Sequence, residues 1–276
     1  MQFVKVHGTG NDFVLLPDLD DRLELTPALV RALCDRHMGI GGDGVLRLAP
    51  ATGADVFMDY RNADGSVAEM CGNGVRCVAK YLADRGHADE VILIDTRGGV
   101  KAVTVVERDG AQRARRLRVD MGAPSRTGTV EVWVDGRPQR LWSVSMGNPH
   151  VVLVTDDVAA APLDRWGPEI ASQFGDGANV EVIERAGPGR VRGRIHERGV
   201  GETLASGTGA SAIAVAAHLE GLSGRETTIS LPGGELEISW TDETLYVTGP
   251  AVEVAHGTVD PDWLELTERR EAQTTA

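Results

Sequence analysis

The chain has 276 residues, of which 42% are hydrophobic, and this is long enough for two domains of ordinary size with apolar cores. Its formal net charge of −13 argues against a nucleic-acid or anionic-membrane partner, because phosphate-binding surfaces are built from clustered Lys and Arg. No apolar run approaches the ~20 residues of a membrane span and no secretory signal pattern is present, so we expect a cytoplasmic protein.

The three cysteines, Cys34, Cys71 and Cys77, are too few and odd in number for a disulfide framework. Free thiols in a reducing compartment fit this number better. The chain has neither a Cys-x-x-Cys pair nor a closely spaced His pair, so we expect no metal site.

The first half alternates between predicted strands and two predicted helices. Strands are expected at residues 2–6, 14–16, 45–48, 55–60, 91–95, 100–107 and 115–120. Helices are expected at 28–36, begun by Thr26 and Pro27, and at 74–85, ended by Gly86.

A G-x-G-x-x-G pattern runs from Gly39 to Gly44, but it follows a predicted helix and precedes a predicted strand. A dinucleotide-binding loop needs the opposite order. We therefore reject nucleotide binding and interpret the segment as a flexible loop that can face a ligand.

The second half repeats this composition. Strands are expected at residues 130–134, 141–145, 151–154, 180–183, 191–196, 227–231, 236–240, 245–248 and 252–259. Helices are expected at 163–174 and 208–219, and the latter is apolar on most sides, which is typical of a central helix. The polar tail is expected to end in disorder. We divide the chain into domains at 1–120 and 121–262, with a tail at 263–276 that packs back on the first.

Two glycine-rich stretches resemble each other at an offset of 135 residues, near half the chain length. They are Cys71-Gly72-Asn73-Gly74 and Ser206-Gly207-Thr208-Gly209, and each stands where a loop becomes a helix. Such an internal repeat suggests a duplicated domain with one functional group delivered from each half.

A thiol at a helix N-terminus experiences the positive end of the helix dipole, which favours the thiolate and makes Cys71 a usable base. The flanking glycines leave backbone amides bare, so a carboxylate can approach them closely. Two opposed helix starts of this kind suit proton removal from the carbon next to a carboxylate, because the new charge develops on the bound oxygens.

Six motifs in order along the chain resemble those of diaminopimelate epimerase. They are His7-Gly8-Thr9-Gly10-Asn11-Asp12-Phe13, Gly39-Ile40-Gly41, Arg61-Asn62-Ala63-Asp64-Gly65-Ser66, Met70-Cys71-Gly72-Asn73-Gly74-x-Arg76-Cys77, Gly147-Asn148-Pro149-His150 and Glu197-Arg198-Gly199-x-Gly201-Glu202-Thr203. The resemblance covers nearly the whole chain.

The resemblance implies an α+β fold of two pseudo-symmetric domains, each a rolled, mostly antiparallel sheet around a central helix, with the active site in the cleft between them. It also implies a cofactor-independent isomerase of lysine biosynthesis that interconverts LL- and meso-diaminopimelate, and a homodimer. Two cysteines act as the acid/base pair of this family.

Carried over by position, the resemblance implies that Cys71 and the residue at 206 are the acid/base pair, with His150 and Glu197 in support. The residues expected to line the substrate are Asn11, Asn62, Asn148, Asn179, Glu197 and Arg198, with amides from Gly72, Asn73, Gly207 and Thr208. Gly44 stands where the family commonly has Gln, so one side-chain contact to the substrate is absent or replaced.

Ser206 stands where the family has its second catalytic cysteine. A serine hydroxyl titrates far above the ~8.5 of a free thiol, so without a dedicated base it holds no useful anionic fraction near neutral pH. Three explanations stay open: a replacement made to trap a ligand or prevent oxidation, which we favour, a natural enzyme with one-sided chemistry, or a non-catalytic amino-acid-binding homologue. A one-base dehydratase or isomerase on the same scaffold is the alternative function.

Overall fold

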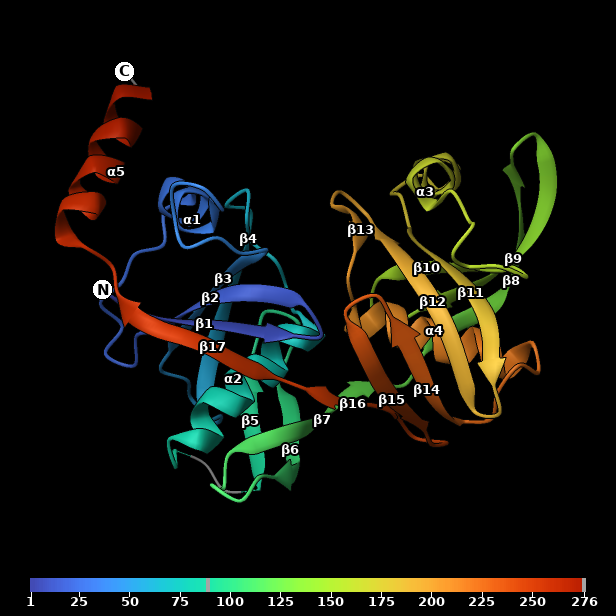
Figure 1. The fold of residues 1–276 in the computed structure, drawn as a ribbon, viewed down its shortest axis with the longest axis horizontal. Helices are drawn as coiled ribbons and strands as arrows, with labels where there is room; N and C mark the ends of the chain where they lie inside the picture. Colours follow the sequence, from blue (N-terminus) through green and yellow to red (C-terminus); the bar gives the residue numbers. More distant parts are fainter. Residues whose placement is uncertain (88–89, 275–276) are drawn as a thin grey trace. The chain divides into compact units, whose positions relative to one another are not determined.

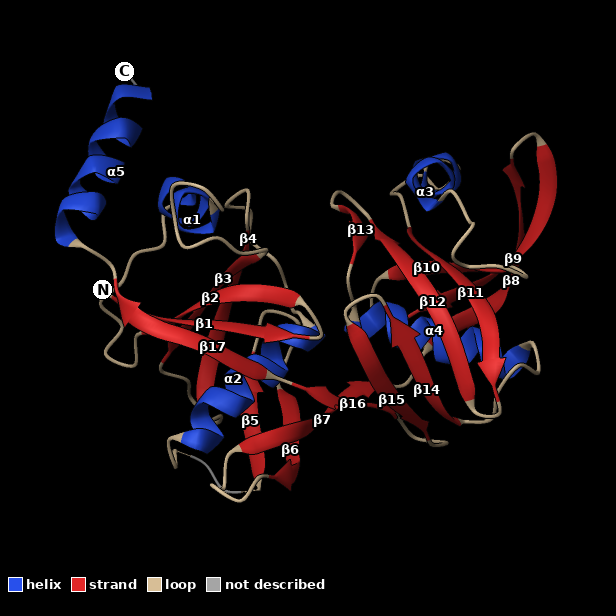
Figure 2. Ribbon diagram, viewed as in Figure 1, coloured by secondary structure: helices blue, strands red, loops and turns tan. Residues whose placement is uncertain are grey.

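The computed structural model describes residues 1–87 and 90–274, and the chain forms two compact units. Unit 1 comprises residues 1–8, 12–119 and 250–276, and unit 2 comprises residues 9–11 and 120–249. Both units are mixed α+β, with strands wrapped around a buried helix (Figures 1 and 2), which confirms the predicted fold class. No helix within the described ranges is long and apolar enough to cross a membrane.

Unit 1 is built from the first strands of the chain and one late strand. Its strands are β1 (Gln2–Gly8), β2 (Asn11–Pro17), β3 (Gly44–Ala49), β4 (Val56–Asn62), β5 (Val91–Asp95), β6 (Lys101–Arg108), β7 (Ala114–Gly122) and β17 (Val252–Thr258). β1 pairs antiparallel with β17, β3 with β4, and β6 with both β5 and β7, whereas β2–β3 and β4–β5 are parallel. The chain passes into unit 2 within β7.

The central helix of unit 1 is α2 (Gly72–Asp84), which contacts β1, β3, β4, β5, β6 and β17. Every α2 residue from Gly72 to Ala83 is buried. The helix was expected to start at Gly74, and it starts two residues earlier because the Cys71 side chain caps it. A helix buried on all sides explains the small and apolar residues of this segment.

Two further helices lie together in unit 1: α1 (Pro27–Cys34) and α5 (Pro261–Thr274). Thr26 Oγ1 accepts from the Leu29 amide at 3.2 Å, and Pro27 follows it, so α1 begins where the sequence predicts. α5 was not predicted. Its Trp263 indole donates to the Met38 carbonyl at 3.0 Å, and Trp263 and Leu264 pack on the core beside α1. Residues 275–276, the very end of the tail, lie outside the described residues.

Unit 2 contains the remaining elements. Its strands are β8 (Ser125–Val134), β9 (Arg137–Ser145), β10 (Pro149–Val154), β11 (Asn179–Gly187), β12 (Arg190–Glu197), β13 (Gly201–Thr203), β14 (Glu226–Leu231), β15 (Gly234–Trp240) and β16 (Leu245–Pro250). Its helices are α3 (Leu163–Ala171) and α4 (Gly207–Leu219), and α4 contacts six of these strands from β9 to β15. α4 is therefore central, as its apolar surface predicted.

The two units share one strand pattern. In unit 1, β2 and β3 are parallel with α1 between them, β4 is antiparallel to β3, and α2 leads to β5, which is parallel to β4. In unit 2, the same relations join β10, α3, β11, β12, α4 and β14. The internal repeat indicated by the glycine motifs thus extends to six elements of each unit.

The units differ from the sequence-based division at residues 250–262, which belong to unit 1, and at residues 9–11, which belong to unit 2. The first difference arises because β17 pairs with β1 from Gln2 to His7. The short strand β13, which pairs with β12, was also not predicted.

Candidate active site

Cys71 is the N-cap residue of α2. Its backbone is extended, with φ −139° and ψ 118°, and its Sγ accepts from the Gly74 amide at 3.4 Å. The side chain is half-buried, whereas Cys34 and Cys77 are buried and burial raises the pKa of each of these two thiols to about 12. Cys71 is therefore the accessible thiol of the chain, at a helix end that favours negative charge.

A buried cation lies beneath this helix start. Arg76 is fully buried and donates to Asn73 Oδ1 at 2.6 Å and to the Gly72 carbonyl at 3.2 Å. Its charge acts on both Cys71 and Cys77 and favours their ionised forms, while its own burial lowers the pKa of Arg76. Because the Asn73 side chain is committed to Arg76, Asn73 can offer its backbone amide to a ligand but not its Oδ1.

Gly44 and Asn62 are cross-strand partners on β3 and β4. The Asn62 Nδ2 donates to Ser66 Oγ at 3.0 Å. Leu46, two residues after Gly44, lies 3.1 Å from the position that a Cβ on Gly74 would take. The same strand therefore connects Gly44 to the start of α2, and we call Cys71, Gly72, Asn73, Gly44 and Asn62 the first half-site.

Ser206 is the N-cap residue of α4, with φ −134° and ψ 131°, nearly the backbone geometry of Cys71. Its Oγ accepts from the Gly209 amide at 3.3 Å and lies 3.4 Å from Thr208 Oγ1. Ser211 Oγ donates to the Gly207 carbonyl at 2.8 Å, where the equivalent residue of α2 is Arg76. The first turn of α4 thus repeats that of α2 with hydroxyls in place of the thiol and the guanidinium.

His150 lies at the start of β10, beside α4, and is held on both sides of its ring. Nδ1 is 2.6 Å from Glu181 Oε1, and Nε2 is 3.0 Å from Asn148 Oδ1. The side chains of His150 and Glu181 are fully buried. Glu181 Oε1 also lies 3.2 Å from the position of a Cβ on Gly209, so the carboxyl lies under the first turn of α4. Burial raises the pKa of Glu181.

Asn179, Glu197 and Arg198 lie near His150, at the start of β11 and the end of β12. Glu197 Oε1 accepts from Thr203 Oγ1 at 2.7 Å. The Asn179 amide donates to the Pro149 carbonyl at 3.1 Å and accepts from the Arg198 backbone amide at 3.0 Å. The exposed Arg198 guanidinium donates to the Asp176 carbonyl at 2.7 Å. We call these three residues with Asn148, His150, Ser206, Gly207 and Thr208 the second half-site.

Asn11 is the first residue of β2 and is grouped with unit 2, although the rest of the strand belongs to unit 1. The turn before it requires Gly10, which has φ +84°, and a Cβ there would come within 2.9 Å of Leu204. Leu204 is two residues before Ser206, so the Thr9–Asn11 turn lies close to the start of α4.

The expected site residues correspond pair by pair between the half-sites. Gly44 and Asn179, Asn62 and Glu197, Cys71 and Ser206, and Asn73 and Thr208 are each 135 residues apart. The strand register supports this, because Phe13 pairs with Gly44 on β2–β3 while His150 pairs with Asn179 on β10–β11. Asn11 and Asn148 each precede these strand residues by two.

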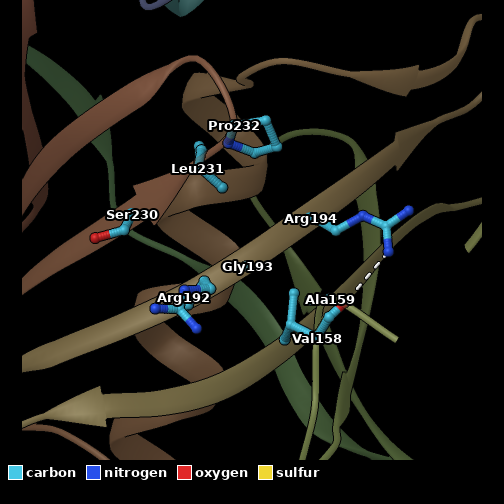
Figure 3. Close-up of a pocket in the computed structure, with 8 residues that line it drawn as sticks. All are labelled: Val158, Ala159, Arg192, Gly193, Arg194, Ser230, Leu231 and Pro232. Atoms are coloured by element: carbon cyan, nitrogen blue, oxygen red, sulfur yellow. Dashed lines mark hydrogen bonds between the residues drawn. The ribbon is translucent and has the colours of Figure 1, made fainter. Parts of the chain in front are cut away.

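A separate hollow of about 260 Å³ in unit 2 does not contain these residues. Figure 3 shows it beside β12, with Arg194 donating to the Val158 carbonyl. Arg194 is paired with Glu202, and Arg192 with Glu184. Since both arginines already have carboxylate partners, we assign no ligand to this hollow. Among the residues whose side chains the structure describes, no cluster of three His, Cys, Asp or Glu could hold a metal ion.

Two residues that contact the half-sites, Arg76 and Glu181, were not identified as candidates from the sequence. Both are charged residues between apolar neighbours: Arg76 lies between Val75 and Cys77 on α2, and Glu181 lies between Val180 and Val182 on β11. A charge that interrupts such a stretch is the signal that could have identified them, because burying it costs free energy unless it is paired.

The chain is similar to known proteins over nearly its whole length. The family model described as diaminopimelate epimerase matches residues 3–127 and 142–254. The diaminopimelate epimerase of Streptomyces coelicolor is 46% identical, over 95% of this chain and 96% of the relative. That of Mycobacterium sp. (strain KMS) is 43% identical, over 98% of this chain and 100% of the relative.

Solved structures share the fold at low sequence identity. A phenazine biosynthesis protein of the PhzF family from Bacillus anthracis aligns with a TM-score of 0.73 at 14% identity, covering 94% of this chain and 99% of that chain. A probable proline racemase from Agrobacterium radiobacter K84, with bound carbonate, aligns with a TM-score of 0.70 at 19% identity, covering 95% and 93%. These likenesses concern the fold alone.

Proposed function

Because this chain belongs to the diaminopimelate epimerase family and is an isomerase of amino-acid biosynthesis, we propose that it interconverts LL- and meso-diaminopimelate by moving the proton on one α-carbon. The observation on which the proposal rests is the shared capping geometry of Cys71 and Ser206. Each side chain accepts from the third residue of its helix, at 3.4 Å and 3.3 Å. The two positions proposed for the acid and the base therefore share one backbone conformation and one capping hydrogen bond.

We assign the two helix starts to the substrate α-carboxylate. Gly72 and Asn73 on α2, and Gly207 and Thr208 on α4, would offer backbone amides at the positive ends of the helix dipoles. Removal of the α-proton puts negative charge on the carboxylate oxygens. Amides already directed at these oxygens stabilise this charge more than they stabilise the substrate, and this lowers the barrier.

Cys71 is the base of the first half-site in this proposal. Its thiolate would take the α-proton and become a thiol, while the electron pair of the C–H bond passes to the carbon and its carboxylate. The buried Arg76 charge and the helix end both favour the thiolate. The polar side chains Asn11, Asn62, Asn148, Asn179, Glu197 and Arg198 would bind the rest of the substrate, with Gly44 offering backbone only.

Ser206 would be the acid on the other face of the carbon. Donating its hydroxyl proton leaves an alkoxide, which is far less favourable than a thiolate near neutral pH. We therefore propose that inversion is impaired while proton removal by Cys71 persists. The expected consequence is exchange of the α-proton without change of configuration.

A single experiment tests this function. LL- and meso-diaminopimelate are incubated separately with the protein in deuterium oxide, and α-proton exchange and inversion are followed by NMR and chiral chromatography. The proposal is supported if only one isomer exchanges its α-proton and if this exchange is faster than inversion. Rapid inversion in both directions would show that Ser206 is a competent acid, and absence of exchange and inversion from both isomers would overturn the assignment of Cys71.

The hydroxyl at Ser206 also supports a second candidate, a one-base dehydratase or isomerase. Such an enzyme removes the α-proton with Cys71 and expels a β-substituent, so it needs no second thiol. A keto acid formed from a β-hydroxy or β-chloro amino acid would identify it. A non-catalytic amino-acid-binding protein would instead bind diaminopimelate in calorimetry with no exchange.

The cytoplasmic location and the homodimer are proposals that follow from the family alone. Sedimentation of the purified protein tests the dimer directly, with a mass twice that of the 29.4 kDa chain expected.

A further inference from the structure

We infer that Glu181 is a positioning residue of the second half-site, which fixes the ring of His150 and, through it, the side-chain amide of Asn148. The inference deepens the proposed function and rests on it only for the assignment of Asn148 to the substrate. Glu181 itself would not touch the substrate.

The three side chains form one hydrogen-bonded chain across β10 and β11. Glu181 Oε1 is 2.6 Å from His150 Nδ1, and His150 Nε2 is 3.0 Å from Asn148 Oδ1. The strands are parallel, with His150 opposite Asn179 and Glu181 opposite Val152. Glu181 and His150 are fully buried, whereas Asn148 is half-buried. The series of hydrogen bonds therefore runs from the buried Glu181 to Asn148, which solvent or a ligand can reach.

The number of protons on these three side chains determines which atom donates in each of the two hydrogen bonds. An amide oxygen only accepts, so Nε2 of His150 must carry a proton to bond to Asn148 Oδ1. At Nδ1, either the ring donates to an ionised Glu181, or a protonated Glu181 donates to the ring. Nε2–H faces Asn148 in both arrangements. The Asn148 Oδ1 is thus always the bonded atom, and its Nδ2 is left as the donor for a ligand carboxylate.

The corresponding positions of the other unit show that the fold does not need this pair. Phe13 occupies the place of His150 on β2, and Leu46 occupies the place of Glu181 on β3. Leu46 packs 3.1 Å from the Cβ position of Gly74, just as Glu181 lies 3.2 Å from that of Gly209. Apolar residues can therefore fill this space. Burying the polar pair of unit 2 costs free energy that an apolar pair would not, and we take this as a sign of a functional role.

The surroundings of Glu181 act on its charge in both directions. Glu181 Oε2 is buried without a hydrogen-bond partner in the described part of the chain, so Oε1 makes the whole contact to the histidine. Glu197 on β12 adds a negative charge that, like burial, favours the protonated carboxyl. The first turn of α4 above Glu181 contains no acidic residue, and its amides favour negative charge beneath it.

Nitrogen NMR of the histidine ring tests the first link without any substrate. The protein is labelled with ¹⁵N-histidine, and the signals of His150 are identified by their loss in His150→Gln. We expect Nε2 of His150 to be protonated between pH 6 and pH 8. A His150 ring with an unprotonated Nε2 would overturn the inference.

The second link is tested by ligand affinity in two variants of Glu181. Glu181→Leu copies the residue of unit 1 and should weaken diaminopimelate binding in calorimetry about tenfold, because Asn148 is no longer oriented. Glu181→Gln keeps the side-chain volume, so it should fold even if Glu181→Leu does not. Its side-chain amide can donate to Nδ1 of His150, and Nε2 should therefore stay protonated. The control is Glu235→Gln, which removes a surface carboxylate paired with Arg190 and should bind as the wild type does.

Unchanged affinity in Glu181→Leu would refute the positioning role, as would loss of Nε2 protonation in Glu181→Gln. If the wild-type protein binds no diaminopimelate, the proposed function fails, and the ring signals of His150 in the wild type and in Glu181→Gln still decide the inference.

Discussion

Arg76 Nη2 donates to Asn73 Oδ1 over 2.6 Å in the interior of unit 1, where the Arg76 side chain is fully buried. The same guanidinium donates to the carbonyls of Gly72 and Pro250. One cation therefore joins the first turn of α2 to Pro250, the last residue of β16. It combines a structural contact with an electrostatic effect on Cys71.

We predict that Arg76→Met lowers the free energy of unfolding by about 2 kcal/mol, because Asn73 Oδ1 is left buried without its donor. The same change should slow alkylation of Cys71, since the cation that favours its thiolate is lost. Urea unfolding and iodoacetamide kinetics measure the two effects. Arg22→Met, which removes an exposed arginine paired with Asp20, should change neither.

Alkylation should distinguish the three cysteines. At neutral pH, one equivalent of iodoacetamide should modify Cys71, because Cys34 and Cys77 are buried with pKa values raised to about 12. Peptide mass spectrometry identifies the modified residue, and unfolding in urea should expose all three. Modification of Cys77 at a comparable rate in the native protein would contradict the buried environment described for it.

The pH dependence of stability should contain a contribution from Asp12. Its hydrogen bonds and ion pairs with Lys5 and Arg36 outweigh its burial and lower its pKa from 3.8 to about 2. A lowered folded pKa means that the stabilisation is complete above pH ~4 and is lost as the pH falls towards 2, and its upper limit is about 2 kcal/mol.

In Asp12→Asn the free energy of unfolding should therefore be lower at pH 6, and it should fall less than that of the wild type between pH 5 and pH 3. Denaturant titrations at both pH values measure the difference. Asp20→Asn, at an exposed ion pair with Arg22, serves as the control. Equal acid sensitivity of the wild type and Asp12→Asn would contradict the assignment.

Replacing Gly44 by Gln, the residue that the resemblance implies at this position, should not improve the enzyme. A Cβ at this position would lie 2.5 Å from the Arg61 carbonyl and 2.7 Å from the Tyr60 ring. Gly44→Gln is therefore expected to lower the free energy of unfolding by about 2 kcal/mol through backbone displacement on β3 and β4. Gly110→Gln, where nothing lies within 4 Å, should be tolerated. A stable and more active Gly44→Gln would refute this steric account.

Local signals were sufficient to predict most of the elements. Thr26-Pro27 gave the start of α1, and the paired glycine motifs gave the starts of α2 and α4 to within two residues. These signals are local because capping depends on side chains within one turn of the helix. The repeat between the motifs was visible for the same reason.

The features that the sequence did not predict depend on contacts between distant segments. α5 is polar over most of its length, and it packs on unit 1 through Trp263 and Leu264, far from α1 in the chain. β13 has three residues and exists by pairing with β12. The burial of Arg76 and Glu181 likewise follows from packing. The motif that contains Arg76 and the strand that contains Glu181 were predicted, but the roles of the two charged side chains were not.

The most direct test of the whole account is the rate of inversion in Ser206→Cys. The wild type, Ser206→Cys and the control Cys77→Ser are compared for conversion of LL- to meso-diaminopimelate under the same conditions. Because a thiol can supply the acid and base forms that a hydroxyl cannot, Ser206→Cys should invert at least about 100-fold faster, and Cys77→Ser should match the wild type. An inversion rate in Ser206→Cys equal to that of the wild type would contradict the account.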